Sequence, residues 1–137
     1  MEQAAFSLKN YSFSKVNIDY NNKSNTPDIS IDIKPSGLFD NNNSQYILSF
    51  IFSAKTKDDK PFIVIACDSV FTLKNVDKLE DIPSFFYKNS IAILFPYIRA
   101  FVSTVTLQAN REPMVLPTMN LSALESTLKN HTRTTYQ

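Results

Sequence analysis

The side chains that most often perform catalysis are sparse in this 137-residue sequence. His131 is the only histidine and Cys67 is the only cysteine. A nucleophilic cysteine needs a base or a cation to form its thiolate, and no histidine lies near Cys67 in the sequence. We therefore predict that His131 is solvated close to the chain end and that Cys67 is a small buried hydrophobic residue.

The sequence also contains no clear motif for binding a metal ion or a phosphate group. No cysteine and histidine pattern has the spacing of zinc ligands. The carboxylates in predicted loops are typical of solubilising charge, with a weak cation site as the alternative. They are Asp58, Asp59, Asp77, Glu80 and Asp81. Gly37 is the only glycine, which excludes a phosphate loop built from several glycines. We predict no enzyme, no cofactor and no metal; an enzyme with an unrecognised site is a competing hypothesis.

Composition and charge indicate one globular domain over residues 1–137. Lys and Arg number 14 against 13 Asp and Glu, so the net charge is +1. The basic residues form no block interleaved with aromatics, so no nucleic-acid partner is expected. The beginning of the chain lacks the pattern of a signal peptide, and no membrane partner is expected. A single cysteine excludes an internal disulfide, and we predict a cytoplasmic protein.

Clusters of Asn and Asp separate runs with strand character, and two helical segments follow. The run at 28–34 alternates strictly, which is typical of a half-exposed strand, and the last two strands form a hairpin. A loop covers 74–88, and the tail at about 131–137 is expected to fray. The predicted fold is α+β, with a four-stranded antiparallel sheet and a long and a shorter helix packed on one side. The predicted strands are 6–20, 28–34, 45–56 and 62–73, and the helices lie in 93–110 and 120–130. Pro96 fits the first turn of the long helix; if this helix instead begins near Asn89, Pro96 is expected to kink it.

The segment "ILFPYIRAFVSTVTLQAN" predicts a helix that is apolar on nearly every side, with Arg99 as its one charge. Placed at 100° per residue, it has a broad apolar face around Phe101, with Ala100 and Leu107 almost opposite. A helix that lies on a sheet needs only one apolar stripe. Either its own chain covers the helix completely, or the surplus apolar surface contacts a second subunit.

Two motifs in the C-terminal half resemble the SecB family of export chaperones. "ILFPYIR" is similar to the "ILFPYAR" that opens the family's long helix, through Ile93–Tyr97 and Arg99. "LPTMNLSAL" is similar to the "LAPVNFDAL" that opens its second helix. The matching residues of the second motif are Leu116, Asn120, Ala123 and Leu124.

This resemblance implies a holdase chaperone that binds unfolded polypeptides without ATP and passes preproteins to the SecA motor. It also implies that two protomers form a dimer and that dimers pack through their long helices into a tetramer. Ala100, Phe101 and Leu107 are then the expected interface residues.

Client-binding residues are expected on the fourth strand and before the long helix. Aligning "SVFTL" with the family's "GIFSI" puts Ile63, Ile65 and Cys67 where family residues affect client binding, although inward core or interface positions are the alternative. Phe85, Phe86 and Tyr87 are adjacent in the predicted loop. They cannot all point one way, so at least one is expected to face solvent or a client.

The charge balance departs from the resemblance. Family members are usually acidic and contact the motor through carboxylates on the outer sheet face. Asp19 and Asp32 are the candidate partner-binding carboxylates here, but Lys15 stands where another carboxylate is expected. We therefore expect weak association with SecA. The alternative function is a SecB-fold adaptor, or a chaperone linked to a toxin and antitoxin, with one dedicated protein partner.

Overall fold

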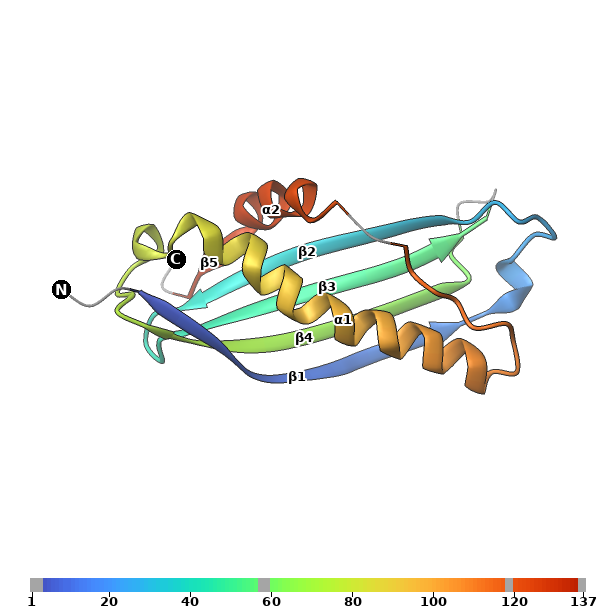
Figure 1. The fold of residues 1–137 in the computed structure, drawn as a ribbon, viewed down its shortest axis with the longest axis horizontal. Coiled ribbons are helices and arrows are strands. Elements are labelled where there is room, and N and C mark those ends of the chain that lie inside the picture. The colour runs from blue at the N-terminus through green and yellow to red at the C-terminus, as the bar shows by residue number, and fades with distance from the viewer. Residues whose placement is uncertain (1–3, 57–59, 118–119, 136–137) are drawn as a thin grey trace.

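A computed structural model describes residues 4–56, 60–117 and 120–135. Its centre is one five-stranded sheet in the order β1-β4-β3-β2-β5 (Figure 1). The four long strands pair antiparallel, whereas β5 runs parallel to β2. The strands are β1 (Ala5–Ile18), β2 (Ser30–Asp40), β3 (Gln45–Lys55), β4 (Ile63–Lys74) and β5 (Thr132–Thr134).

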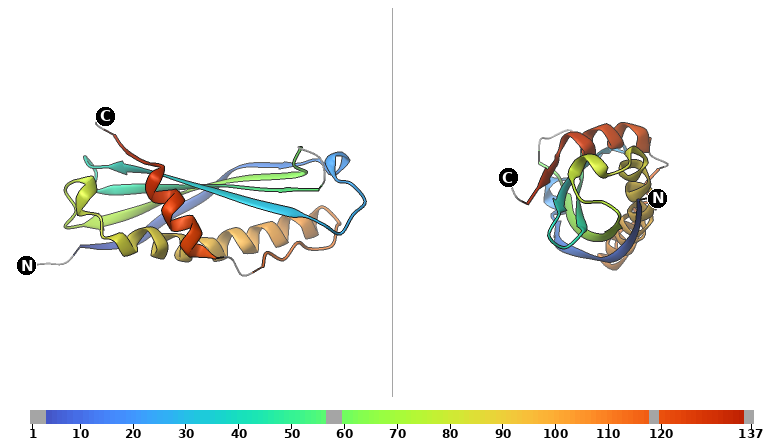
Figure 2. Two further views of the ribbon diagram at one scale, coloured as in Figure 1. Left: turned by 90° about the horizontal axis from the view of Figure 1, so that it is seen from above. Right: turned by 90° about the vertical axis from the view of Figure 1, so that its left-hand side faces the viewer.

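Both α-helices lie on the same side of this sheet (Figure 2). They are α1 (Ser84–Gln108) and α2 (Leu121–Asn130), and two short 3-10 turns cover Tyr20–Asn22 and Leu79–Asp81. The α+β class and the two helices on one side agree with the sequence prediction. Because the other side of the sheet has no helix, the fold has a helix-covered inner face and an uncovered outer face among the described residues.

The predicted four-stranded, purely antiparallel sheet is wrong in one respect. Residues 132–134, which lie in the segment expected to fray, form β5 beside Gly37–Phe39. The backbone N–H of Gly37 donates to the His131 carbonyl, and that of Thr135 donates to Phe39. Parallel pairing satisfies backbone groups that a frayed tail would leave to water, so residues 132–134 are ordered. Residues 136–137 of the tail that was expected to fray lie outside the described residues.

Strand β3 shows why one face of the sheet is buried. Tyr46, Leu48, Phe50 and Phe52 are 0–1% exposed, and the residues between them are partly or fully exposed. Successive side chains of a strand point to opposite faces, so these large residues all point towards the helices. The alternation therefore fixes the core between the sheet and α1.

Helix α1 begins earlier than the sequence predicted. It starts at Ser84, after Pro83 in an extended conformation, and Pro96 lies inside it on the exposed side. The expected loop up to residue 88 is thus wrong. Phe86 is fully buried and packs edge-to-face against Phe6 and Tyr46, with ring centroids 4.8 and 4.7 Å apart. This tertiary packing extends the helix by more than two turns.

The length and composition of α1 would allow it to cross a membrane. In this fold, however, one side of the helix is embedded in the core. Its inward residues Ile91, Leu94, Ile98 and Val102 are 0–1% exposed. The apolar character of this side is therefore accounted for by packing on the sheet.

Helix α2 begins and ends as the sequence predicted. The Asn120 side chain accepts a hydrogen bond from the backbone N–H of Ser122 at 3.1 Å, so Asn120 is the N-cap. Leu128 is fully buried. The helix leads directly into β5, which anchors the chain end beside β2.

Candidate functional site

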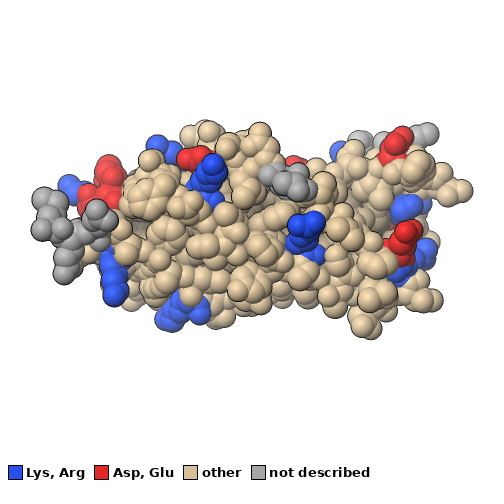
Figure 3. Space-filling model, viewed as in Figure 1, with Lys and Arg blue, Asp and Glu red and all other residues tan. Residues whose placement is uncertain are grey.

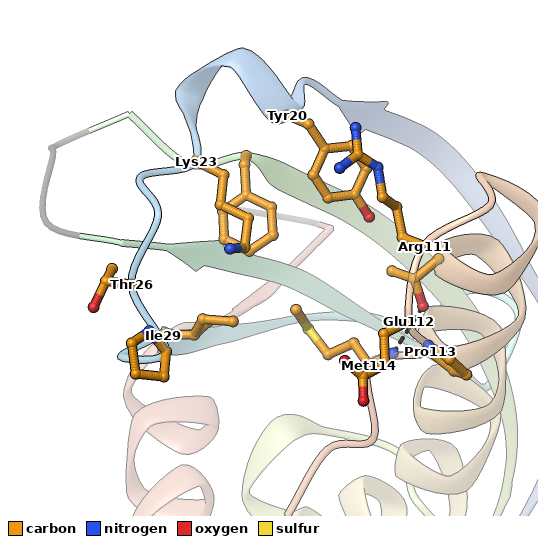
Figure 4. A pocket seen from close by; sticks show the side chains of 11 residues that line it. Tyr20, Lys23, Thr26, Ile29, Arg111, Glu112, Pro113 and Met114 are labelled. Carbon is orange, nitrogen blue, oxygen red and sulfur yellow. Dashed lines mark hydrogen bonds between the residues drawn. The ribbon is translucent and has the colours of Figure 1, made fainter.

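A pocket of about 440 Å³ opens where the β1–β2 connection faces the loop after α1 (Figure 4). The two walls are far apart in sequence, because one is formed by residues 20–29 and the other by residues 106–114. Ile29 and Met114 point towards one another across the opening. The lining residues are Tyr20, Lys23, Thr26, Pro27, Ile29, Phe62, Thr106, Arg111, Glu112, Pro113 and Met114.

Hydrogen bonds to the β3–β4 hairpin hold the first wall in place. The backbone N–H of Asp19 donates to the Phe62 carbonyl at 2.9 Å. Asn22 Nδ2 donates to the Pro61 carbonyl at 3.1 Å, and the Ser24 N–H donates to Thr56 Oγ1 at 3.0 Å. The β1–β2 connection is therefore tied down along its first half.

The second wall is attached to the last turns of α1. Arg111 N–H donates to the Thr106 carbonyl at 3.1 Å, directly after Asn110, whose φ of 61° turns the chain back. Ser103 Oγ donates to the Met114 carbonyl at 2.8 Å. Thr106 Oγ1 accepts from the Met114 N–H at 2.9 Å. Both walls of the pocket are thus preorganised by the fold.

The pocket combines aromatic rings with two cationic groups. The Arg111 guanidinium lies 4.1 Å from the centre of the Tyr20 ring, and Lys23 Nζ lies 5.9 Å from the centre of the Phe62 ring. A cation within about 6 Å of an aromatic face is attracted by the ring quadrupole. Glu112 is the one acidic residue in the lining. The pocket therefore offers apolar contacts from Ile29, Pro113 and Met114 beside cationic groups that lie over its two rings.

The described part of the chain contains no cluster of His, Cys, Asp or Glu side chains that would suit metal binding. No group of three or more His, Cys, Asp or Glu side chains there is placed to hold a metal ion. Asp81, one of the loop carboxylates, instead accepts hydrogen bonds from the backbone N–H groups of Asp77 and Lys78. Two others, Asp58 and Asp59, lie outside the described residues.

The predicted client-binding residues of the fourth strand lie in the core. Ile63, Ile65 and Cys67 are 0–1% exposed on the inner face of β4, which corresponds to the alternative interpretation of these positions. Burial raises the pKa of the Cys67 thiol to about 11, with a smaller contribution from Asp68. These side chains are therefore closed to a client in this conformation, and none of them lines the pocket.

The three aromatics before the long helix are in fact in its first turn. Phe86 and Tyr87 are buried, and burial raises the pKa of the Tyr87 hydroxyl. Phe85 is 53% exposed. Phe85 therefore faces solvent, as expected for one of three adjacent aromatic residues. It does not line the pocket.

The outward side of α1 retains apolar surface. Ala100 and Leu107 are exposed, and Phe101 is half-buried against Phe13, with ring centroids 3.9 Å apart. Ile93 and Tyr97 extend the same exposed side. Figure 3 shows that the surface over α1 is mostly uncharged.

The two candidate partner-binding carboxylates have local roles. Asp19 accepts a hydrogen bond from the Asn21 N–H at 3.0 Å and caps the first 3-10 turn. Asp32 lies on β2 with Lys34 Nζ 3.7 Å from its carboxylate. Neither carboxylate lines the pocket.

Sequence reasoning missed the pocket residues Tyr20, Lys23, Ile29, Arg111 and Met114. Tyr20 and Ile29 were assigned to the predicted strands 6–20 and 28–34, Lys23 to the Asn-rich cluster between them, and Arg111 and Met114 to the segment between the two helices. The signal that could have marked them is the presence of apolar side chains inside two otherwise polar connections.

A family model and one of two relatives identify the same family. The family model described as preprotein translocase subunit SecB matches residues 2–131. The protein-export protein SecB of Magnetococcus marinus is 38% identical over 60 residues, which cover 44% of this chain and 38% of that protein. An uncharacterized protein of Methanocaldococcus jannaschii, MJ0357, is 38% identical over 53 residues, or 39% of this chain and 34% of that protein. The chain thus aligns with little more than a third of each relative's length.

A solved structure has a similar fold. It is the SecB-like chaperone Rv1957 of Mycobacterium tuberculosis, in complex with a ChAD peptide from the Rv1956 HigA1 antitoxin. The TM-score is 0.66 at 11% identity, over 83% of this chain and 90% of that chain. At this identity the likeness concerns the fold.

Proposed function

Because the chain belongs to the SecB family, we propose that it binds segments of unfolded polypeptides and holds them without ATP. A chaperone role is what the family and the fold support. The observation that carries the finer proposal is the pocket between the β1–β2 connection and the loop after α1. The apolar part of its mixed lining, formed by Ile29, Pro113 and Met114, offers affinity to many client sequences, because apolar burial is non-directional.

Binding of this kind needs no catalytic step. A protein that binds the unfolded state preferentially withdraws it from aggregation by mass action alone. The walls of the pocket are fixed by hydrogen bonds that Ser24 and Ser103 donate and that Thr106 accepts from the Met114 N–H. A preorganised site loses little conformational entropy when a client segment enters.

The exposed apolar side of α1 supports assembly into a dimer or tetramer. Phe85, Tyr97 and Leu107 are each more than 40% exposed on this helix. A stable interface buries roughly 800 Å² per partner. An oligomer would present several pockets to one long client, and the second contact would then be intramolecular.

Association with the SecA motor is proposed to be weak, in a cytoplasmic setting. A single exposed ion pair contributes only about 0 to 1 kcal/mol, so a docking contact needs several carboxylates acting together. Asp19 caps a turn and Asp32 lies beside Lys34. Lys15 adds a charge of the wrong sign for a basic partner.

A second candidate is a chaperone or adaptor with one dedicated partner. Rv1957, which has a similar fold, was solved in complex with an antitoxin peptide. This complex supports a chaperone with one dedicated partner as the second candidate. The two candidates differ in breadth. A holdase binds several unrelated unfolded proteins with similar affinity, whereas an adaptor binds one and ignores the rest.

The pocket proposal is tested by one substitution and a matched control. Ile29 lines the pocket and Val115 does not, yet both are exposed apolar residues in connections. Ile29→Glu should weaken binding of a fluorescently labelled, reduced and unfolded protein by about tenfold, while Val115→Glu should not. Equal affinities for both variants and the parent would contradict the assignment of the pocket.

A further inference from the structure

The outer face of the sheet carries an apolar centre that nothing in the described chain covers. Both helices pack on the other side (Figure 2). On β3 and β4 the outward residues Ile47 and Val70 are register partners, and so are Ile51 and Ala66. Ile51 is 48% exposed. On β2, Leu38 lies opposite Ile47 and extends this centre.

Basic residues occupy outward positions around this centre. Lys15 lies opposite Ala66, and Lys34 lies opposite Ile51. Arg133 on β5 is the register partner of the outward Leu38. Each of these strands alternates between the two faces, so partners in register share a face. The basic residues at outward positions of the sheet are Lys15, Lys34, Lys55, Lys74 and Arg133.

The carboxylates at outward positions already have partners within the protein. Asp32 lies 3.7 Å from Lys34. Asp68 accepts from Ser49 Oγ at 2.7 Å, and Asp40 accepts from Asn43 Nδ2 at 2.7 Å in the β2–β3 turn. In contrast, Lys15, Lys74 and Arg133 form no ion pair with another described residue. The face therefore offers cations rather than carboxylates to a partner.

The outer face is also hollowed at one end of the β2–β3 pair. A depression of about 430 Å³ is lined by the outward residues Ser30, Asp32, Lys34, Ser53 and Lys55, together with Ile31 and Pro61. Two lysines thus border a concave site next to the exposed Ile51: Lys34, which pairs with Asp32, and Lys55, which forms no ion pair with another described residue. A side chain with a carboxylate fits this site by charge, and an apolar neighbour fits Ile51.

We propose that the outer sheet face docks an acidic protein, through a segment that alternates carboxylate and apolar side chains. Charge complementarity selects the acidic partner, and the aliphatic centre selects a protein. The outward positions of the long strands carry no aromatic side chain on which bases would stack. The polarity is opposite to that expected of a carboxylate face that docks a basic motor.

NMR shift mapping of the full-length protein tests this proposal. The probe is a synthetic twelve-residue peptide of alternating Glu and Val, and the matched peptide has Lys in place of Glu. The Glu peptide should shift the amides of Ile47, Ile51 and Ala66 and bind at least tenfold more tightly than the Lys peptide. Raising the salt concentration should weaken binding of the Glu peptide, because salt screens the attraction between exposed charges.

A double variant tests which lysines bind the Glu peptide. The double variant K34E and K55E should bind the Glu peptide at least tenfold more weakly than the parent. The control K88E and K129E makes the same change in net charge on the helices and should bind the peptide as the parent does. The proposal is overturned if both peptides bind alike, or if the shifts fall at 20–29 and 111–114, the walls of the client pocket. Stronger shifts of the same face by duplex DNA or by phosphatidylserine vesicles would also overturn it.

This test is separate from that of client binding. Ile29→Glu changes the client pocket and should leave the shifts caused by the Glu peptide at Ile51 unchanged. Loss of client binding with retention of these shifts, or the reverse, shows which of the two surfaces has been assigned correctly.

Discussion

The buried Thr106 side chain accepts a hydrogen bond from the backbone N–H of Met114 at 2.9 Å. The single proton of the same hydroxyl is shared between two carbonyls one turn back, that of Val102 at 2.9 Å and that of Ser103 at 3.1 Å. One hydroxyl therefore joins the end of α1 to the loop that forms a wall of the pocket. The position of Met114 in that wall depends on this contact.

Thr106→Val should loosen this wall while it preserves the side-chain shape. The Met114 N–H would lose its acceptor, and an unsatisfied buried donor costs about 1–3 kcal/mol. We expect a lower free energy of unfolding and a several-fold weaker affinity for an unfolded client. The control is Thr104→Val, because Thr104 is exposed. Urea unfolding and client titration on both variants provide the check; parent-like client affinity in Thr106→Val would show that this hydroxyl does not shape the site.

Gly37 is required by the close approach of Tyr46. A Cβ at residue 37 would collide with the Tyr46 hydroxyl, which hydrogen-bonds to Thr132 Oγ1 at 2.7 Å. Gly37→Ala should destabilise the fold by about 1–3 kcal/mol, as overpacking does. Hydrogen exchange should also speed up at Thr132–Thr134.

A second substitution checks this cause. Tyr46→Leu removes both the hydroxyl and the ring carbon Cζ that the added Cβ would meet, so it should cost less in a Gly37→Ala background than in the parent protein. Ser36→Ala, at the exposed neighbouring position, is the control and should leave stability nearly unchanged. Additive effects of the two core substitutions would argue against the collision.

The outward side of α1 is predicted to be a subunit contact. Leu107→Asp or Ala100→Asp should split the assembly, because an unpaired charge in an apolar interface is costly. Light scattering at micromolar concentration measures the mass of each variant, and Ser122→Asp on α2 is the control. If the parent is a monomer, or if both variants keep the parent's mass, this side of the helix contacts no second subunit.

Cys67 should make folding stability depend on pH in the alkaline range. Its folded-state pKa is raised to about 11, so the folded protein holds the thiol proton more tightly than the unfolded chain does. The resulting stability is complete below the unfolded pKa of about 8.5 and is lost as pH rises through the folded pKa. Between pH 7.5 and 9.5 the parent should therefore lose about 1 kcal/mol more than Cys67→Ala.

Urea unfolding of both proteins at the two pH values measures this difference. The raised pKa of Tyr46 is common to both proteins and cancels in the comparison. Parallel pH dependences would mean that the thiol is not buried as described.

The local sequence pattern was enough to predict most of the helices and strands. The long strands follow from alternation, and α2 follows from its Asn120 cap and its leucine spacing. β2 continues past its predicted end through Pro35 and Gly37, two residues that are unfavourable in strand interiors. Pro35 is tolerated because β5 pairs only with residues 37–39, so β2 is an edge strand at Pro35.

The features that depend on long-range contacts were not predictable from local pattern. The start of α1 is set by Phe86 packing against Phe6 and Tyr46, and β5 is set by pairing with a strand about a hundred residues earlier. The pocket is likewise made by two connections that meet only in the folded chain. Each connection taken alone resembles an ordinary polar turn.

Suppression of aggregation is the measurement that tests the chaperone account most directly. The purified protein is mixed at stoichiometric ratio with an unrelated, chemically unfolded protein in the absence of nucleotide, and light scattering is followed over time. The account predicts suppression by the parent and by Val115→Glu, with clear loss in Ile29→Glu. Scattering that rises in the presence of the parent as fast as in its absence, across several unrelated clients, would contradict a holdase function.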